Sequence, residues 1–132
     1  MSEQRQTELR EAELEITTNR DELTWCVAWL ESSVEPVAET SELAYPTYRA
    51  EVDRLVDAAR CKFWIDRSYH SNRPDDVCIA TVVAADLPTM KAVMTWFWRG
   101  ERFCMGHLGA VIRSGLALAI FRRALSLLED TP

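Results

Sequence analysis

Cys104 and His107 are the residues whose types and spacing best fit a chemical site in this chain. Residues three apart lie on one side of a helix, so the sulfur and an imidazole nitrogen could bind one metal ion. A structural metal site needs four ligands, and the others would have to come from distant segments: Cys61, Cys78 or His70. Because a single Cys-x-x-His pair is a weak signal, we expect no metal and no cofactor.

The same pair could also act as a thiolate and its base, with Glu101 or Asp66 orienting the imidazole. Activation of a thiol requires an exposed, electropositive setting, whereas Cys104 lies among apolar residues. The sequence contains no phosphate-binding glycine loop, nucleophile elbow, paired metal-binding histidines or dinucleotide fingerprint. A small enzyme using Cys104 and His107 is therefore the weakest of three functional hypotheses, and we assign no catalytic residue.

The four glycines of the chain all lie between Gly100 and Gly115, in a stretch that otherwise favours helix. Glycine in a helix costs about 1 kcal/mol relative to alanine, so the cluster predicts that another group comes close to the backbone there. On a continuous helix, one strip would carry a glycine groove flanked by two arginines: Arg102, Gly106, Gly109 and Arg113.

This groove has two explanations. In the first, which we favour, another helix crosses there and each arginine pairs with a carboxylate such as Glu101, Asp66 or Asp86. In the second, two guanidinium groups hold an anionic ligand or an acidic segment. The second explanation is the hypothesis of a small anionic-ligand-binding regulator, which could act as a homodimer.

The segment R-G-E-R-F-C-M-G-H-L-G-A-V-I-R-S-G, followed by L-A-I-F-R-R-A-L, resembles the end of a bacterial and archaeal family known as a domain of unknown function. The matching positions are Arg99, Glu101, Arg102, Phe103, Gly106, Leu108 and Gly115. The resemblance covers about the last third of the chain. Residues 1 to 45 show none of it, so Trp25 and Trp29 look like additions of this protein. The resemblance implies a fold and a set of important positions, and no chemistry.

Hydrophobic periodicity predicts an all-α fold, a compact single-domain bundle of about five to seven helices. Asn19, followed by Glu22, predicts an N-cap that starts a second helix after residue 19, and Gly115 predicts a left-handed helix end. The expected helices cover 3–16, 20–33, a segment with Pro46 in its first turn, 77–85 with Asp75 or Asp76 as its cap, a segment restarting at Asp86 and Pro88, 101–114 and 116–129.

The net charge of −6 is concentrated near the N-terminus, since residues 1–42 carry −8 and residues 43–132 carry +2. An acidic helical segment over about 1–42 should therefore pack on, or extend from, a helical core over about 43–132. Such a field repels a phosphate backbone and attracts basic protein surfaces. Tryptophan is enriched in binding hot spots, although large apolar side chains are more often in the core. The predicted interface residues are Glu8, Glu11, Glu15, Asp21, Glu22, Trp25 and Trp29.

The favoured hypothesis is a protein-binding module or inhibitor whose acidic surface meets a basic partner that handles nucleic acid. Its narrowest version is an anti-defence protein of a phage or mobile element, such as an anti-CRISPR. Direct nucleic-acid binding is not expected. No signal peptide or membrane-spanning stretch is visible and the cysteines show no paired spacing, so we expect a cytoplasmic protein without disulfides.

Overall fold

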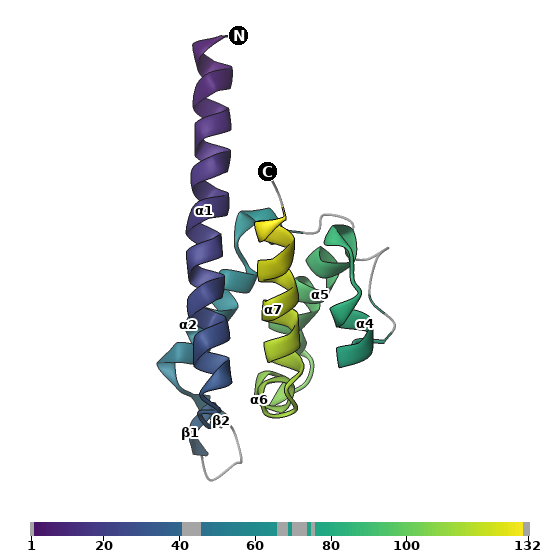
Figure 1. Cartoon of the computed structure of the whole chain (residues 1–132). Coiled ribbons are helices and arrows are strands. Elements are labelled where there is room, and N and C mark those ends of the chain that lie inside the picture. Colours follow the sequence, from purple (N-terminus) through teal and green to yellow (C-terminus); the bar gives the residue numbers. More distant parts are fainter. Residues whose placement is uncertain (1, 41–45, 66–68, 70–73, 75, 131–132) are drawn as a thin grey trace.

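The computed structural model describes residues 2–40, 46–65, 69, 74 and 76–130. This part of the chain forms six α-helices, two short 3₁₀ helices and one two-stranded hairpin (Figure 1). The bounds are α1 (Glu3–Glu31), β1 (Val37–Thr40), β2 (Pro46–Tyr48), α2 (Ala50–Ala59), η1 (Lys62–Trp64), α4 (Ile79–Val83), α5 (Leu87–Arg99), η2 (Gly100–Arg102), α6 (His107–Arg113) and α7 (Leu116–Glu129). The predicted all-α class and number of helices are confirmed.

The first helix is continuous where the sequence predicted two, and the predicted N-cap at Asn19 is wrong. The side chain of Asn19 is buried inside α1: Nδ2 donates to the carbonyl of Ala58 (3.2 Å) and Oδ1 accepts from Nε1 of Trp64 (2.7 Å). Asparagine is a modest helix former. Here its polar atoms have partners in the fold, so tertiary contacts keep the helix intact through this position.

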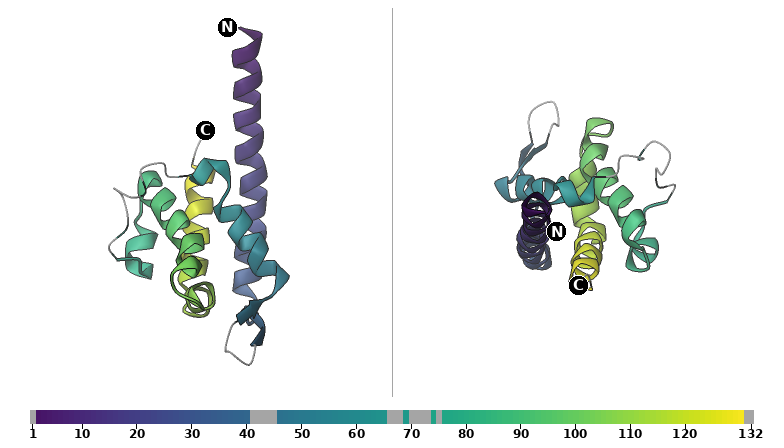
Figure 2. Two further views of the ribbon diagram at one scale, coloured as in Figure 1. Left: turned by 180° about the vertical axis from the view of Figure 1, so that it is seen from behind. Right: turned by 90° about the horizontal axis from the view of Figure 1, so that it is seen from above.

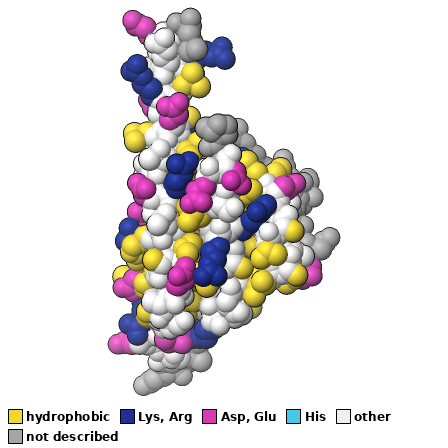
Figure 3. Space-filling view, viewed as in Figure 1, with side chains coloured by type: hydrophobic (Ala, Val, Ile, Leu, Met, Phe, Trp, Pro, Cys, Tyr) yellow, Lys and Arg dark blue, Asp and Glu magenta, His cyan; other side chains and the backbone are white. Residues whose placement is uncertain are grey.

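Only the second half of α1 packs on the body of the molecule (Figures 1 and 2). The buried side chains of α1 share one helical face: Asn19, Leu23, Cys26 and Leu30. Helix α7 lies alongside this half in the opposite direction, and Nη2 of Arg20 donates to the carbonyl of Leu128 (3.0 Å). Residues 2–14 are all exposed, and their acidic, basic and apolar side chains are visible along the projecting turns in Figure 3. We call residues 3–14 the arm.

The hairpin between α1 and α2 was not predicted. Strands β1 and β2 are antiparallel, with Val37 opposite Tyr48. Pro46 was expected in the first turn of a helix. It instead opens β2, a position where the missing N–H removes no interior ladder bond, and α2 begins at Ala50. The amphipathic face predicted for the helix is confirmed, since its buried side chains include Val52, Leu55 and Ala59.

The middle of the chain follows the prediction at α5 and departs from it at α4. Asp86 caps α5 by accepting a hydrogen bond from the backbone N–H of Thr89 (3.0 Å), and Pro88 lies in the first turn. Helix α4 is shorter than the expected 77–85, and its N-cap is Cys78 rather than Asp76. Asp75, the other predicted cap, lies outside the described residues. The ring of Phe97 in α5 meets that of Phe121 in α7 edge to face at 5.4 Å, deep in the core.

The helix predicted over 101–114 is broken. Residues 100–102 form η2, and α6 begins at His107, directly after Gly106, whose φ of 87° lies in the left-handed region. Gly115, with φ of 84°, separates α6 from α7 as predicted. The break matters for function because the glycine strip predicted between Arg102 and Arg113 required one continuous helix.

Candidate functional site

Six of the seven predicted interface residues lie on one stripe of α1. Successive members are separated by three, four or seven residues, which places them on the same side of the helix. The seventh, Asp21, is exposed beside the stripe. The stripe runs from the arm to the packed half of α1: Glu8, Glu11, Glu15, Glu22, Trp25 and Trp29.

A groove of about 490 Å³ lies between this stripe and α2. Its apolar surface includes Leu14 from α1, Ala58 from α2 and Cys61 from the turn that follows. Leu14 is 66 % exposed although it is a large aliphatic side chain. Four carboxylates border the groove: Glu11, Glu15, Glu22 and Asp57. We call this feature the acidic groove.

Among these carboxylates, Glu22 is the one held by an arginine. Nε and Nη2 of Arg54 bind its two oxygens at 2.9 and 3.0 Å, and the side-chain hydrogen bond lowers the pKa of Glu22 below its usual value. Glu15 accepts a hydrogen bond from Sγ of Cys61 (3.7 Å), and burial raises the pKa of that thiol. In the described parts of the chain, Glu11, Glu15 and Asp57 make no ion pair.

The two tryptophans of the stripe continue the surface beyond Glu22. Their rings are stacked, with centroids 6.3 Å apart and planes at 11°, and the guanidinium of Arg54 lies 3.9 Å from the centre of the Trp25 ring. Both rings pack against the core yet are only half-buried. Trp25 and Trp29 therefore combine a core contact with a solvent-facing edge.

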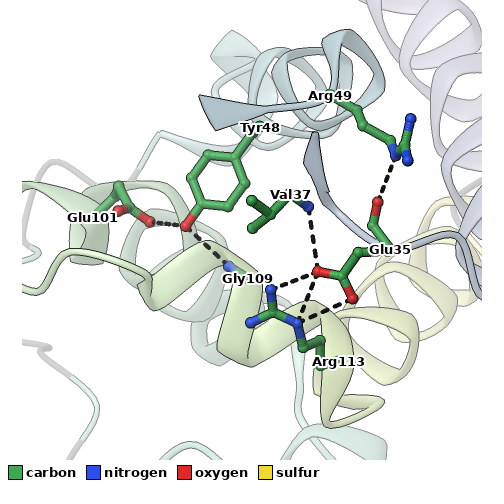
Figure 4. Close-up of polar contacts among 7 residues, drawn as sticks. All are labelled: Glu35, Val37, Tyr48, Arg49, Glu101, Gly109 and Arg113. Atoms are coloured by element: carbon green, nitrogen blue, oxygen red, sulfur yellow. Dashed lines mark hydrogen bonds and ion pairs between the residues drawn. The ribbon is translucent and has the colours of Figure 1, made fainter. Parts of the chain in front are cut away.

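The group that approaches the glycine backbone is Tyr48 (Figure 4). Its hydroxyl accepts from the N–H of Gly109 (3.2 Å) and donates to Oε1 of Glu101 (2.7 Å). A Cβ on Gly109 would lie 3.4 Å from the tyrosine ring, in ordinary van der Waals contact, and 3.2 Å from Nη1 of Arg113. Burial, together with the hydrogen bond to Glu101, raises the pKa of Tyr48 to about 12. A tyrosine from β2, rather than the crossing helix that we favoured, thus lies against Gly109, whereas a Cβ on Gly106 or Gly115 would meet no atom within 4 Å.

Glu101 has a structural role that sequence reasoning missed. Besides Tyr48, its carboxylate accepts from the backbone N–H groups of Gly106 (2.7 Å) and Leu108 (2.9 Å), the donors left free at the start of α6. The sequence signal for this role is a glutamate five residues before a glycine that adopts the left-handed conformation. This spacing has its meaning only where the helix is broken, and the sequence predicts one continuous helix over 101–114.

Arg102 and Arg113 do not flank a common groove, so that prediction is corrected. Arg113 forms an ion pair with Glu35, just before the hairpin, and lowers the pKa of that carboxyl (Figure 4). The guanidinium of Arg102 lies 5.6 Å from the centre of the Trp98 ring. The carboxylates expected to pair with the arginines, Glu101 and Asp86, cap helices instead, and Asp66 lies outside the described residues.

Cys104 and His107 line one cleft of about 350 Å³ but do not share a helix. Cys104 is exposed in the turn before α6, and the imidazole of His107 packs edge-on against Trp96 with centroids 4.6 Å apart. Burial lowers the pKa of His107 and so favours the neutral form of the ring. Glu101, one group expected to orient this imidazole, is engaged by Tyr48 and the backbone of α6.

Among the described residues, no group of three or more His, Cys, Asp or Glu side chains could hold a metal ion. His70, one of the suggested ligands, lies outside those residues. The four cysteines are free. No helix in the described ranges has the length and apolar character needed to cross a bilayer.

Comparison with family models matches residues 15–130 to a family of unknown function, DUF6508. The match is much longer than the C-terminal third on which the resemblance rested, and it includes the positions of Trp25 and Trp29. No curated protein and no solved structure matches the chain significantly.

Proposed function

We propose a role for this protein from the residues on its own surface. The chain belongs to DUF6508, a family of unknown function, so the family itself suggests no activity. The role is that of a protein-binding module in which the acidic groove takes a basic, partly apolar segment of a partner protein. The observation that carries the proposal is the combination of an apolar groove with three bordering carboxylates, Glu11, Glu15 and Asp57, that lack an ion pair among the described residues.

The apolar part of the groove supplies the driving force. Leu14 is largely exposed, and covering apolar surface contributes about 25 cal/mol per Å². The edges of Trp25 and Trp29 extend the surface along the same stripe, and tryptophan is the residue type most enriched in binding hot spots. A partner segment with apolar side chains facing α1 would cover both regions.

The carboxylates of the groove determine which charge a partner segment must carry. Lysine or arginine residues flanking its apolar face would meet Glu11, Glu15 and Asp57, and complementary charges give specificity and fast association. A second copy of this chain would instead bring further carboxylates into the groove. Like-charge contacts oppose that arrangement, so a homodimer through this surface is disfavoured.

The arm extends the proposed binding surface beyond the body of the molecule. Residues 3–14 contribute no buried side chain, so the body of the molecule does not account for their helical conformation. Helices that lack tertiary packing are marginal in water at this length. A partner segment lying along the stripe would stabilise these turns, whose Glu11 and Leu14 already line the groove.

A peptide experiment tests the proposal. An amphipathic peptide of leucine and lysine, about 15 residues long, is compared by calorimetry with the same peptide carrying glutamate for lysine. We expect the lysine peptide to bind at least about tenfold more tightly at low salt, with affinity falling as salt rises. Equal affinity for the two peptides would refute the charge argument.

A matched pair of variants localises the binding. Glu11→Gln/Glu15→Gln/Asp57→Asn neutralises the rim, whereas Glu3→Gln/Glu13→Gln/Asp53→Asn makes the same change of net charge at exposed positions away from the groove. The rim variant should lose about tenfold in affinity for the lysine peptide, and the control should lose little. Equal losses would show that net charge alone attracts the peptide, and the groove would then have no specific role.

The narrower hypothesis, an inhibitor of a nucleic-acid-handling protein such as an anti-CRISPR, has its own test. If the carboxylates occupy a basic surface of the partner protein where phosphates bind, nucleic acid should compete with this chain for binding to that partner. Capture that resists excess nucleic acid would exclude phosphate mimicry while leaving the protein-binding role intact.

A further inference from the structure

Three arginines place their guanidinium groups near the ring of Trp98. The guanidinium carbon of Arg60 lies 5.0 Å from the ring centre, that of Arg102 lies 5.6 Å away and that of Arg99 lies 5.9 Å away. Arg60 directly follows α2, Arg102 is the last residue of η2 and Arg99 is the last residue of α5. We call these four residues the arginine cluster.

The arginine cluster has no counter-charge among the residues that the structure describes. Arg54 makes an instructive contrast, since it also stacks on a tryptophan but is neutralised by Glu22. Glu101 lies next to Arg102 in sequence, and its carboxylate is turned into the start of α6. Guanidinium groups that have no carboxylate partner are available to bind an anion.

An aromatic cleft adjoins the cluster through Arg99. The guanidinium of Arg99 also lies 5.3 Å from the centre of the Tyr69 ring, and both residues line the cleft that contains Cys104 and His107. Trp96 and Phe103 provide further rings, and Phe103 is 75 % exposed. Tyr69 is buried and Trp96 packs against His107, so Phe103 is the exposed ring of the cleft on which a planar ligand could stack.

From this juxtaposition we infer a site for a nucleoside monophosphate: the phosphate lies among Arg60, Arg99 and Arg102, and the base stacks in the aromatic cleft. The cleft volume of about 350 Å³ is within the range of small-molecule sites. The net charge of −6 opposes a long polyanion, whereas local guanidinium groups dominate the field felt by a small ligand within about one Debye length, roughly 10 Å. The inference does not depend on the acidic groove.

Calorimetry with the four nucleoside 5′-monophosphates tests the site. We expect at least one to bind with a dissociation constant below about 1 mM. The matching nucleoside and inorganic phosphate should each bind at least about tenfold more weakly, because each fills only half of the site. Absence of binding by all four nucleotides, or equal binding of inorganic phosphate, would overturn the inference.

Variants distinguish the cluster from general positive charge. Arg102→Gln and Arg60→Gln, both at exposed positions, should each weaken nucleotide binding by about tenfold, and Phe103→Ala should weaken binding of the nucleotide but not of phosphate. Arg54→Gln is the matched control and should leave the affinity unchanged. Equal losses in Arg54→Gln and the cluster variants would refute the site. Tighter binding of a single-stranded oligonucleotide than of any monophosphate would refute the small-ligand assignment.

Discussion

The hydroxyl of Tyr48 donates a hydrogen bond of 2.7 Å to Glu101, which lies 53 residues further along the chain. This contact connects the hairpin to the start of α6, because the same carboxylate accepts two backbone N–H groups there. A residue on an unpredicted strand and a residue in a broken helix thus hold the glycine-containing region together (Figure 4).

The first prediction concerns this network. Glu101→Gln replaces one acceptor oxygen with an amide, so at least one donor is left without a partner, and we expect a loss of about 2–4 kcal/mol in the free energy of unfolding. Tyr48→Phe leaves the two backbone bonds of Glu101 in place and should cost less. Denaturant unfolding of both single variants and the double variant should give a coupling energy of about 0.5–3 kcal/mol. Strictly additive effects would show that the two side chains act separately.

A second prediction concerns Gly100 and His107. The backbone of Gly100 is in the ordinary helical region, with φ of −58°, so alanine fits its conformation. A Cβ there would nevertheless collide with the imidazole of His107. Gly100→Ala should therefore destabilise the protein by about 1–3 kcal/mol. In a His107→Ala background the collision is absent, and the same substitution should be neutral or mildly stabilising. An undiminished cost in that background would contradict the steric explanation.

The third prediction is a pH dependence. Burial places the pKa of His107 below its usual value of 6.5, so the unfolded chain binds a proton more readily than the folded one. The contribution of the neutral ring to stability is complete above the unfolded pKa and is lost as the pH falls through the folded pKa. Between about pH 7 and 5, wild type should lose more stability than His107→Gln. Parallel pH profiles for the two proteins would contradict this assignment.

The fourth prediction concerns Asn19. Asn19→Leu leaves Nε1 of Trp64 without its partner in the interior, whereas the carbonyl of Ala58 still accepts from the N–H of Cys61 (3.4 Å), and we expect a cost of about 1–3 kcal/mol. Thr17→Ala, two residues away on the exposed side of α1, is the control and should change stability by less than about 0.5 kcal/mol. Thermal and denaturant unfolding measure both variants. A mild effect of Asn19→Leu would mean that water satisfies Nε1 of Trp64.

Local sequence signals were sufficient to predict several elements of the fold. Asp86 and Pro88 start α5 as predicted, Gly115 ends α6 in the left-handed region, and the spacing of Val52, Leu55 and Ala59 identifies the inner face of α2. Each of these signals acts within about one or two helical turns, so the sequence contains all of its parts. The stripe on α1 could be predicted for the same reason, since helical spacing alone aligns its members.

The tertiary structure decided whatever depended on distant partners. Asn19 looks like a cap in the sequence, and only Ala58 and Trp64 make it a helix-interior residue. The sequence predicts that Glu101 and Arg113 lie on one continuous helix. In the structure Glu101 instead binds Tyr48, and Arg113 pairs with Glu35. The sequence by itself determined helical faces and the distribution of charge, because neighbours in the chain carry that information. Which polar groups meet was determined by packing, since a buried hydrogen-bonding group must find a partner wherever the fold supplies one.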